Sequence, residues 1–409
     1  MSNKTTGEMN KQNNPKRARV PRLRFPEFRE AKEWEVEPLR KLAKRCTGKN
    51  AKREHTRVLT NSAEYGVLDQ RDYFEKDIAN QGNLEGYYIV EKGDYVYNPR
   101  MSTSAPVGPI SRNNVGTGVM SPLYTVFRFA SSNNDFFAHY FKSTHWHHYM
   151  RQASSTGARH DRMSITNDDF MDMPLPAPAP KEQQKIADCL STLDELIIAE
   201  AHKLDALRDH KGELMSKLFP REGEIVPRLR FPDFQDSEEW MGHSLESISD
   251  GISSGRDKSD PEGMYHLYGS TGIIGTTSTA SYSGEFLLVA RVGANAGLLT
   301  KAVGKFGVTD NTLVIRLGDT VNLNFVFYCL GALELNKLVF GSGQPLITGG
   351  QLKALSLYFP GSAEQQRITD CLSSLDDLVA AQSQKIDGLK AHKKGLMQQL
   401  FTGLNEEWE

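Results

Sequence analysis

The chain carries the same opening segment twice, and this repeat limits the folds that it can adopt. VPRLRFPEFREAKEW runs from Val20 to Trp34, and VPRLRFPDFQDSEEW runs from Val226 to Trp240. Self-similarity at a fixed offset, here 206 residues, is the signature of a repeated architecture. The sequence therefore predicts two related halves, and its 409 residues suffice for two or three domains with separate cores.

A second and longer repeat begins at Glu182 and again at Glu364. EQQKIADCLSTLDELIIAEAHKLDALRDHKGELMSKLF and EQQRITDCLSSLDDLVAAQSQKIDGLKAHKKGLMQQLF are identical at more than half of the aligned positions. Apolar residues recur in both at alternating spacings of three and four, which is the heptad pattern of a coiled coil. They are Ile186, Leu190, Leu193, Ile197, Leu204, Leu207, Leu214 and Leu218 in the first copy, and Ile368, Leu372, Leu375, Val379, Ile386, Leu389, Leu396 and Leu400 in the second. Because prolines precede each copy and end any earlier helix, we expect two long helices that pair with each other.

Polar residues interrupt this apolar seam and predict how the two helices pair. Glu200 and Lys211 interrupt the first helix, and Gln382 and Lys393 interrupt the second at equivalent positions. An antiparallel pair along residues 193–218 places Glu200 opposite Lys393 and Lys211 opposite Gln382. A parallel pair would instead set Lys211 against Lys393, at a like-charge cost. We therefore expect the antiparallel arrangement, with these four residues fixing its register.

Between the repeats lie two segments that differ in sequence but share landmarks. Gly93–Arg100 (GDYVYNPR) and Gly284–Arg291 (GEFLLVAR) both indicate a turn followed by a strand, and further strands are expected at Tyr124–Phe129 and Thr312–Leu317. The predicted fold class is therefore α+β, with two pseudo-symmetric α+β domains separated by an antiparallel coiled coil. The expected limits are a disordered basic arm at 1–19, a first domain at 20–180, a central helix at 181–220, a second domain at 221–362, a distal helix at 363–403 and a tail at 404–409.

Composition narrows the class of protein only in part. Residues 1–25 carry seven Lys and Arg against one Glu, whereas the net charge is −2, so charge neither demands nor excludes nucleic acid. No apolar run approaches the roughly 20 residues that cross a bilayer, and the N-terminal segment is polar. The cysteines show no paired spacing; they are Cys46, Cys189, Cys329 and Cys371. These features predict a cytoplasmic protein without a disulfide framework or a membrane role.

The sequence lacks the motifs of enzymes that act on DNA. A DNA amino-methyltransferase needs an Asn/Asp-Pro-Pro-aromatic motif, whereas Asn98-Pro99 is followed by Arg100 and no Pro-Pro dipeptide occurs. The phosphate-binding pattern GxxxxGK(S/T) is missing as well. We therefore predict no catalytic residue and no cofactor.

Several histidines lie close together in the first variable segment. They are His139, His145, His147, His148 and His160. No cysteine accompanies them, and their spacing fits no structural zinc pattern. We expect an aromatic and basic surface helix at Tyr140–Tyr149 rather than a metal site.

In combination, these features resemble the specificity subunit of type I restriction–modification enzymes over essentially the whole chain. The resemblance rests on the doubled EQQ-initiated helices, the doubled PRLRFP segments, the Gly-then-strand elements, and the parallel of ITNDDFMDMPLP with ITGGQLKALSLY. It implies a non-catalytic subunit whose two variable domains are target recognition domains, each reading one half of a gapped DNA site. It further implies that the paired helices set the spacing. The implied partners are double-stranded DNA, two modification (methyltransferase) subunits and restriction–translocation subunits.

The residues expected to contact DNA lie near strand ends and in the loops ahead of the long helices. Arg151–Arg162 (RQASSTGARHDR) is the richest stretch, and Gly341–Thr348 (GSGQPLIT) is its counterpart. Arginine can donate two parallel hydrogen bonds to guanine, and Gln or Asn can do the same to adenine, although contacts to phosphate carry no sequence information. The candidates are Arg100, Arg151, Arg159, His160, Arg162, Arg291, Asn295 and Gln344.

Two other functions stay open at this point. The nearly neutral charge is compatible with a coiled-coil structural adaptor that has no DNA role. A stand-alone methyltransferase is disfavoured by the missing motif. A gel-shift assay with random-sequence DNA, with and without a methyltransferase partner, separates these functions from DNA recognition.

Overall fold

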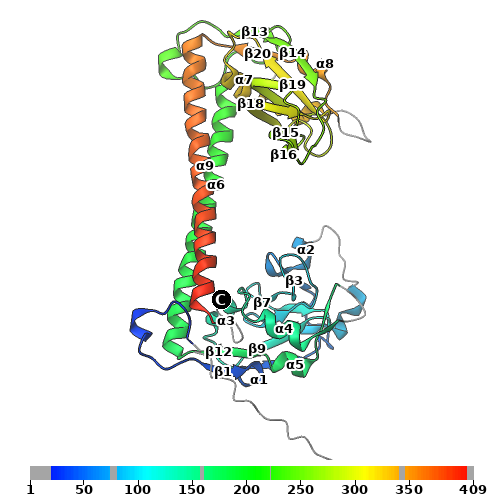
Figure 1. Ribbon diagram of the computed structural model, residues 1–409, viewed down its shortest axis with the longest axis vertical. Helices are drawn as coiled ribbons and strands as arrows, with labels where there is room; N and C mark the ends of the chain where they lie inside the picture. Colours follow the sequence, from blue (N-terminus) through cyan, green and yellow to red (C-terminus); the bar gives the residue numbers. More distant parts are fainter. Residues whose placement is uncertain (1–19, 74–80, 157–160, 222, 340–345, 403–409) are drawn as a thin grey trace, which may run out of the picture. The chain divides into compact units, whose positions relative to one another are not determined.

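The structure is a computed structural model that describes residues 20–73, 81–156, 161–221, 223–339 and 346–402 (Figure 1). The predicted basic arm at 1–19 and tail at 404–409 lie outside these residues. By its internal contacts the chain divides into unit 1, which is Met1–Ile198 with Asp387–Glu409, and unit 2, which is Ala199–Ile386. Each unit contains one variable domain and one part of each long helix.

The two long helices predicted from the heptad pattern are confirmed. α6 runs from Pro180 to Leu218 and α9 from Ser362 to Leu400 (Figure 1). Each follows a short extended strand, β12 at Pro174–Ala177 or β20 at Ser356–Phe359. Pro180 is the first residue of α6, a position at which the missing N–H of proline costs no helical hydrogen bond.

Each variable domain is closed at its base by a two-stranded antiparallel ribbon. In unit 1, β1 (Glu35–Pro38) pairs with β12, and in unit 2, β13 (Met241–Ser244) pairs with β20. Both first strands follow directly after an opening segment, and both second strands lead directly into a long helix. The repeated parts of the sequence therefore form the same frame in both units.

The variable domain of unit 1 is built on an antiparallel sheet of order β2-β9-β6-β7. Its inner strands, β6 (Tyr95–Tyr97) and β9 (Thr125–Phe129), confirm two of the predicted strands. The outer strands are β2 (Ala43–Arg45) and β7 (Ile110–Arg112). The remaining elements are η1 (Pro26–Phe28), α1 (Leu39–Leu42), β3 (Leu59–Ser62), β4 (Gly66–Asp69), α2 (Gln70–Tyr73), η2 (Gln81–Gly86), β5 (Tyr88–Val90), β8 (Gly118–Met120), α3 (Asp135–Tyr140), α4 (His147–Ala153), β10 (Ser155–Thr156), β11 (Met163–Ser164) and α5 (Asn167–Met171).

The prediction of a surface helix at residues 140–149 is wrong. α3 ends at Tyr140, a turn follows, and α4 begins only at His147. Phe141 and Trp146 are buried, and the indole N–H of Trp146 donates to the carbonyl of Phe141 at 3.1 Å. The aromatic residues belong to the core, because burying their rings removes a large apolar area from water.

The variable domain of unit 2 has a larger sheet of order β14-β19-β17-β18-β15-β16. β17 (Tyr282–Ala290) and β19 (Thr312–Leu317) confirm the other two predicted strands, and they are neighbours, as β6 and β9 are in unit 1. All pairings are antiparallel except that of β15 with β18. The other elements are η3 (Pro232–Phe234), β14 (Ser249–Ser254), β15 (Tyr265–Gly269), β16 (Gly272–Thr277), β18 (Leu299–Val308), α7 (Leu323–Ala332), η4 (Leu335–Leu338) and α8 (Gly349–Lys353). The two domains thus share a frame and a central strand pair but differ in the rest of their sheets.

Candidate DNA interface and its supporting frame

The frame of unit 1 is held by a buried arginine from the opening segment. Nε and Nη2 of Arg24 donate to the two carboxylate oxygens of Glu182, each at 2.7 Å. The same guanidinium donates to the carbonyls of Ala31 and Lys32 at 2.9 and 3.0 Å. Glu182 lies in the first turn of α6, and the hydrogen bond between the two side chains holds the pKa of Arg24 above its ordinary value. A bidentate, charge-assisted pair of this kind fixes orientation as well as position. We call this arrangement the arginine clamp.

Unit 2 repeats the arginine clamp with equivalent residues. Nε and Nη2 of Arg230 donate to Glu364 at 2.9 and 2.6 Å, and the guanidinium also donates to the carbonyls of Ser237 and Glu238. Arg230 follows Arg24 by the offset of the opening repeat, and Glu364 follows Glu182 by the offset of the helix repeat. In each unit, therefore, a copy of the opening repeat binds a copy of the helix repeat.

Each opening segment also reaches the end of the other long helix in its unit. The backbone N–H of Leu23 donates to the carbonyl of Gln399 in α9, and that of Leu229 donates to Lys217 in α6, both at 2.9 Å. The frame thus ties the start of one helix to the end of the other, which requires the two helices to run antiparallel within each unit.

Charged pairs join the helices at equivalent places in the two units. In unit 1 Lys393 of α9 bonds Asp194 of α6, and in unit 2 Lys211 of α6 bonds Asp376 of α9. Glu200 accepts hydrogen bonds from Gln382 at 2.6 Å and from Lys385 at 2.5 Å. All four residues proposed to set the register therefore lie in contacts between the helices.

The individual pairings predicted for these residues are wrong. Lys211 lies opposite Asp376 rather than Gln382, and Lys393 lies opposite Asp194 rather than Glu200. Both partners are six residues earlier in the chain than predicted, which is about one heptad. A slip of one heptad still matches apolar positions with apolar positions, so periodicity cannot distinguish the two registers. Asp194 and Asp376 flank the seam rather than interrupt it, and they select the register because each can reach a lysine within the seam.

A charge exchange between Lys211 and Asp376 tests the observed register. Lys211→Asp and Asp376→Lys should each lower stability by placing like charges across the helix pair. The double exchange should recover part of the loss, with a coupling of about 0.5–1 kcal/mol for partly exposed side chains. Thermal denaturation of the single and double variants measures this coupling energy. The control combines Lys211→Asp with Gln382→Lys, which should show no such coupling, and additivity in the Lys211–Asp376 cycle would contradict the register.

Two of the predicted DNA-contacting residues of unit 1 are brought side by side. Arg100 and Arg162 form an isolated antiparallel bridge, and the N–H of Met163 donates to the carbonyl of Pro99 at 2.9 Å. The carboxylate of Asp161 lies 3.8 Å from Nε of Arg100 and 3.9 Å from Nε of Arg162. One carboxylate thus faces two guanidinium groups, and this edge keeps a net positive charge.

The other candidates of this unit are placed less closely. Arg151 is exposed in the last turn of α4, and the C-cap residue of that helix, Ser154, lies 3.9 Å from the sulfur of Met163. Arg159 and His160 lie outside the described residues. The sequence offered no signal for Asp161 as the shared partner of Arg100 and Arg162, because the contact joins segments far apart in the chain.

Unit 2 brings the corresponding segments together. Val292, directly after Arg291, forms an isolated bridge with Leu346, and the N–H of Ile347 donates to the carbonyl of Arg291 at 2.9 Å. Asn295 is exposed in the loop after β17, and Gln344 lies outside the described residues. In both units the segment after a central strand therefore meets the segment ahead of the closing ribbon.

Arg162 and Arg291 share one feature with Arg45 and Arg112. Nε of each is buried and has no hydrogen-bond partner among the residues that the structure describes. The carboxylate of Asp161 is 3.9 Å from Nε of Arg162, beyond hydrogen-bonding distance. A buried, unpaired donor costs free energy.

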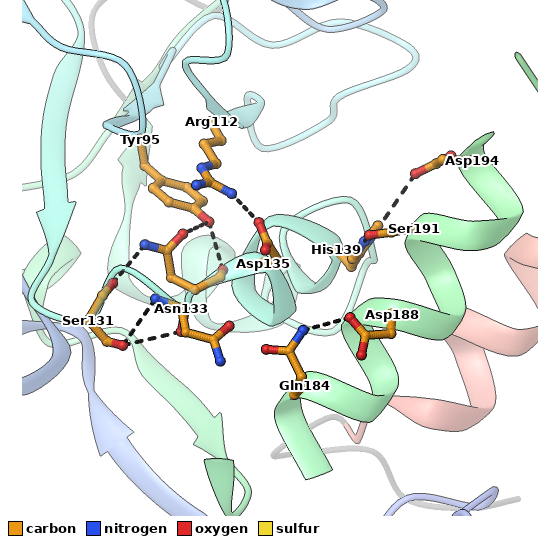
Figure 2. A network of polar contacts seen from close by, with 11 residues as sticks. Tyr95, Arg112, Ser131, Asn133, Asp135, His139, Gln184, Asp188, Ser191 and Asp194 are labelled. Carbon is orange, nitrogen blue, oxygen red and sulfur yellow. Dashed lines mark hydrogen bonds and ion pairs between the residues drawn. The ribbon is translucent and has the colours of Figure 1, made fainter. Parts of the chain in front are cut away.

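His139 of unit 1 is buried and His147 is half-buried. Burial lowers the pKa of His139 to about 4 and that of His147 to about 4, so both rings are neutral at physiological pH. Figure 2 shows His139 beside Ser191 and Asp194 of α6, with Nε2 at 3.0 Å from the Ser191 hydroxyl. Among the described residues, no group of three or more His, Cys, Asp or Glu is arranged to hold a metal ion. No helix in the described part of the chain is long and apolar enough to cross a membrane.

The chain is similar to known proteins in sequence and in structure. Residues 31–208 and 240–391 match the family described as the type I restriction modification DNA specificity domain. The specificity subunit of the type I restriction enzyme EcoprrI of Escherichia coli is 32% identical over 115 residues, which cover 28% of this chain and 29% of that protein. The MjaVIII specificity subunit of Methanocaldococcus jannaschii is 24% identical over 286 residues, which cover 62% of this chain and 66% of that protein. The chain thus matches just under two thirds of the length of one curated relative and less of the other.

Solved structures show the same fold at low sequence identity. A crystal structure of the type I restriction–modification S subunit from M. genitalium has a TM-score of 0.55 and 13% identity, over 94% of this chain and 100% of that chain. A chain from a structural study of complex assembly and conformational transition of the type I R–M system has a TM-score of 0.57 and 17% identity, over 90% and 98%. Since the family match covers well over half of the residues and the fold agrees along the chain, this protein belongs to the type I restriction–modification DNA specificity family.

Proposed function

We propose that the chain is the non-catalytic DNA-recognition subunit of a type I restriction–modification complex. The observation that carries the proposal is the doubled arginine clamp, which holds two variable domains of different internal structure on the same helical frame. A frame that is repeated while the sheets of the two variable domains differ suits two recognition surfaces that read different DNA sequences. In this proposal the domain at 20–180 reads one half of a gapped site and the domain at 221–362 reads the other.

The long helices complete the proposed function. The helix pair sets the spacing between the two half-sites, and its remaining surface docks two modification subunits and, through them, restriction–translocation subunits. Catalysis belongs to those partners.

We further propose that the positively charged edges contact base edges. In unit 1 these are Arg100 and Arg162 with nearby Arg151, and in unit 2 they are Arg291 and Asn295. Arg159, His160 and Gln344 join them on sequence grounds alone. A guanidinium can donate two parallel hydrogen bonds to the two acceptors of guanine in the major groove.

Methylation assays test the assignment of catalysis. The purified chain alone should transfer no methyl group from S-adenosylmethionine to DNA, and adding the modification subunit should produce methylation at one gapped sequence. The control pairs the modification subunit with no specificity chain. Methyl transfer by the chain free of partner would contradict the non-catalytic role, and sequence-independent binding by the complex would favour a structural adaptor instead.

Substituting Arg162 or Arg291 tests the proposed base contacts. Arg162→Gln or Arg291→Gln should weaken binding of the assembled complex to its cognate DNA by about 1–3 kcal/mol, because a bidentate contact to guanine is lost. Binding to unrelated DNA should change little. Arg316→Gln is the control within unit 2, since Arg316 is exposed and faces Asp250 at 3.5 Å. Equal weakening on cognate and unrelated DNA would show that these arginines contact phosphate.

A further inference from the structure

A pocket of about 390 Å³ lies in unit 1, where both long helices meet the turn after α3. Lys142 from that turn, Asp194 and Ile197 from α6, and Lys394 and Met397 from α9 line it. Pockets for small molecules range from about 300 to 1,000 Å³, so this volume suits a small ligand.

The charges in this pocket are not balanced. Asp194 is the one acidic side chain among the lining residues, and it pairs with both Lys393 and Lys142, the latter at 3.6 Å. Lys390 and Lys394 add two further ammonium groups without a carboxylate in the lining. Lys393 is only 8% exposed, and its burial lowers its pKa despite the bond to Asp194. Lys393 is neutralised by Asp194, whereas Lys390 and Lys394 are exposed and meet no carboxylate in the lining, so an anion in the pocket would neutralise their charge.

At the equivalent place in unit 2 the charges are balanced, and an aromatic ring lies beside the lysine. Lys211 faces Asp376 one to one, and the hydroxyl of Tyr328 donates to the same carboxylate at 2.7 Å. The ammonium of Lys211 lies 5.3 Å from the centre of the Tyr328 ring. At the positions that correspond to Lys390 and Lys394, α6 carries Arg208 and Gly212. Lys394 therefore adds a positive charge that α6 lacks at this place, whereas Arg208 keeps the charge of Lys390.

We propose that this pocket binds a compact polyphosphate, such as the phosphate chain of a nucleoside triphosphate. Lys390 and Lys394 are four residues apart on α9, so they lie one above the other on the same face of the helix. Successive phosphates of a linear polyphosphate can each meet one ammonium from this row. The other side of the pocket supplies Lys142, and Ile197 and Met397 give an apolar wall beside the charged one.

Titration calorimetry with the full chain tests the proposal. The probes are sodium triphosphate, ATP and adenosine at equal ionic strength, together with a short DNA duplex of unrelated sequence. We expect one equivalent of triphosphate and of ATP to bind, no binding of adenosine, and affinity that falls as salt is added. Lys390→Gln combined with Lys394→Gln should weaken triphosphate binding at least about tenfold, the effect of losing about 1.4 kcal/mol of interaction.

The substitutions are chosen to leave the fold intact, so that a change in triphosphate binding reports on the pocket alone. Both lysines are exposed at their ends, so the double variant should unfold at the temperature of the unsubstituted chain. Arg208→Gln, at the equivalent position in α6, is the matched control and should leave triphosphate binding within about twofold, less than 0.5 kcal/mol. No saturable binding of triphosphate, an equal loss in Arg208→Gln, or binding of the duplex alone would overturn the proposal. None of these outcomes bears on DNA recognition by the variable domains, which is tested separately by the methylation assays.

Discussion

Replacing Arg24 with Met should lower the free energy of unfolding of unit 1 by about 3–5 kcal/mol, the range for removing one partner of a buried ion pair. The side chains of Arg24 and Glu182 are 6% and 1% exposed, so water cannot take the place of the guanidinium. The variant also leaves the carbonyls of Ala31 and Lys32 without this donor. The loss should loosen the start of α6 together with the opening segment, because the clamp is the buried ion pair that joins them, whereas the pair of Lys185 with Glu27 is exposed.

Thermal and chemical denaturation of the full chain measure this effect. Arg29→Met is the matched control, since Arg29 lies in the same opening segment but is exposed, and it should change stability by less than about 0.5 kcal/mol. Arg230→Met should act on unit 2 as Arg24→Met acts on unit 1, because its contacts are equivalent. A double-mutant cycle of Arg24→Met with Glu182→Gln should be strongly non-additive. Equal stability of the Arg24 and Arg29 variants would show that the clamp does not hold the frame.

The repeated parts of the fold could be predicted because each rests on local sequence. Heptad spacing and flanking prolines are sufficient for α6 and α9, and β-branched and aromatic runs are sufficient for the central strands of both units. The arginine clamp could also have been found, since Arg24 and Glu182 are each retained in the second copy as Arg230 and Glu364. Both residues belong to the repeated parts of the chain, so each half contains the two ends of one clamp.

Other features depend on contacts that no local pattern encodes. The helix register was missed by about one heptad, because the apolar seam is periodic and the deciding charges, Asp194 and Asp376, lie outside it. The break between α3 and α4 was missed because the same aromatic residues that suggest a surface helix are needed in the core. Nor could the order of the six strands of unit 2 be derived, since its strands pair across long stretches of chain.

Some features of the candidate site could likewise be predicted from the sequence, and others could not. Residue types and strand ends pointed to Arg100, Arg162 and Arg291, and the structure places the first two side by side. That adjacency depends on a single bridge between distant segments, and so does the position of Asp161 between the two arginines. Figure 2 shows how the α3 side of this domain is held: Arg112 bonds Asp135 at the start of α3, and His139 faces α6.

Exchanging one variable domain should change half of the recognised DNA sequence. Replacing Arg22–Pro180 with the corresponding segment of another family member should redirect one half-site and leave the other half-site and the gap as they were. Discrimination between specific and unrelated DNA is about a thousandfold or more, so the original half-site should lose essentially all methylation. The donor segment must carry an arginine at the position of Arg24, because Glu182 stays behind and would otherwise be buried without a partner.

Sequencing that detects methylated bases across a genome provides the measurement, in cells that contain the modification subunit and either the original or the exchanged chain. The account predicts two gapped motifs that share one half-site and the same gap length and differ only in the other half-site. Two motifs that differ in both halves, or in the length of the gap, would contradict the claim that each variable domain reads its half-site independently on a common frame.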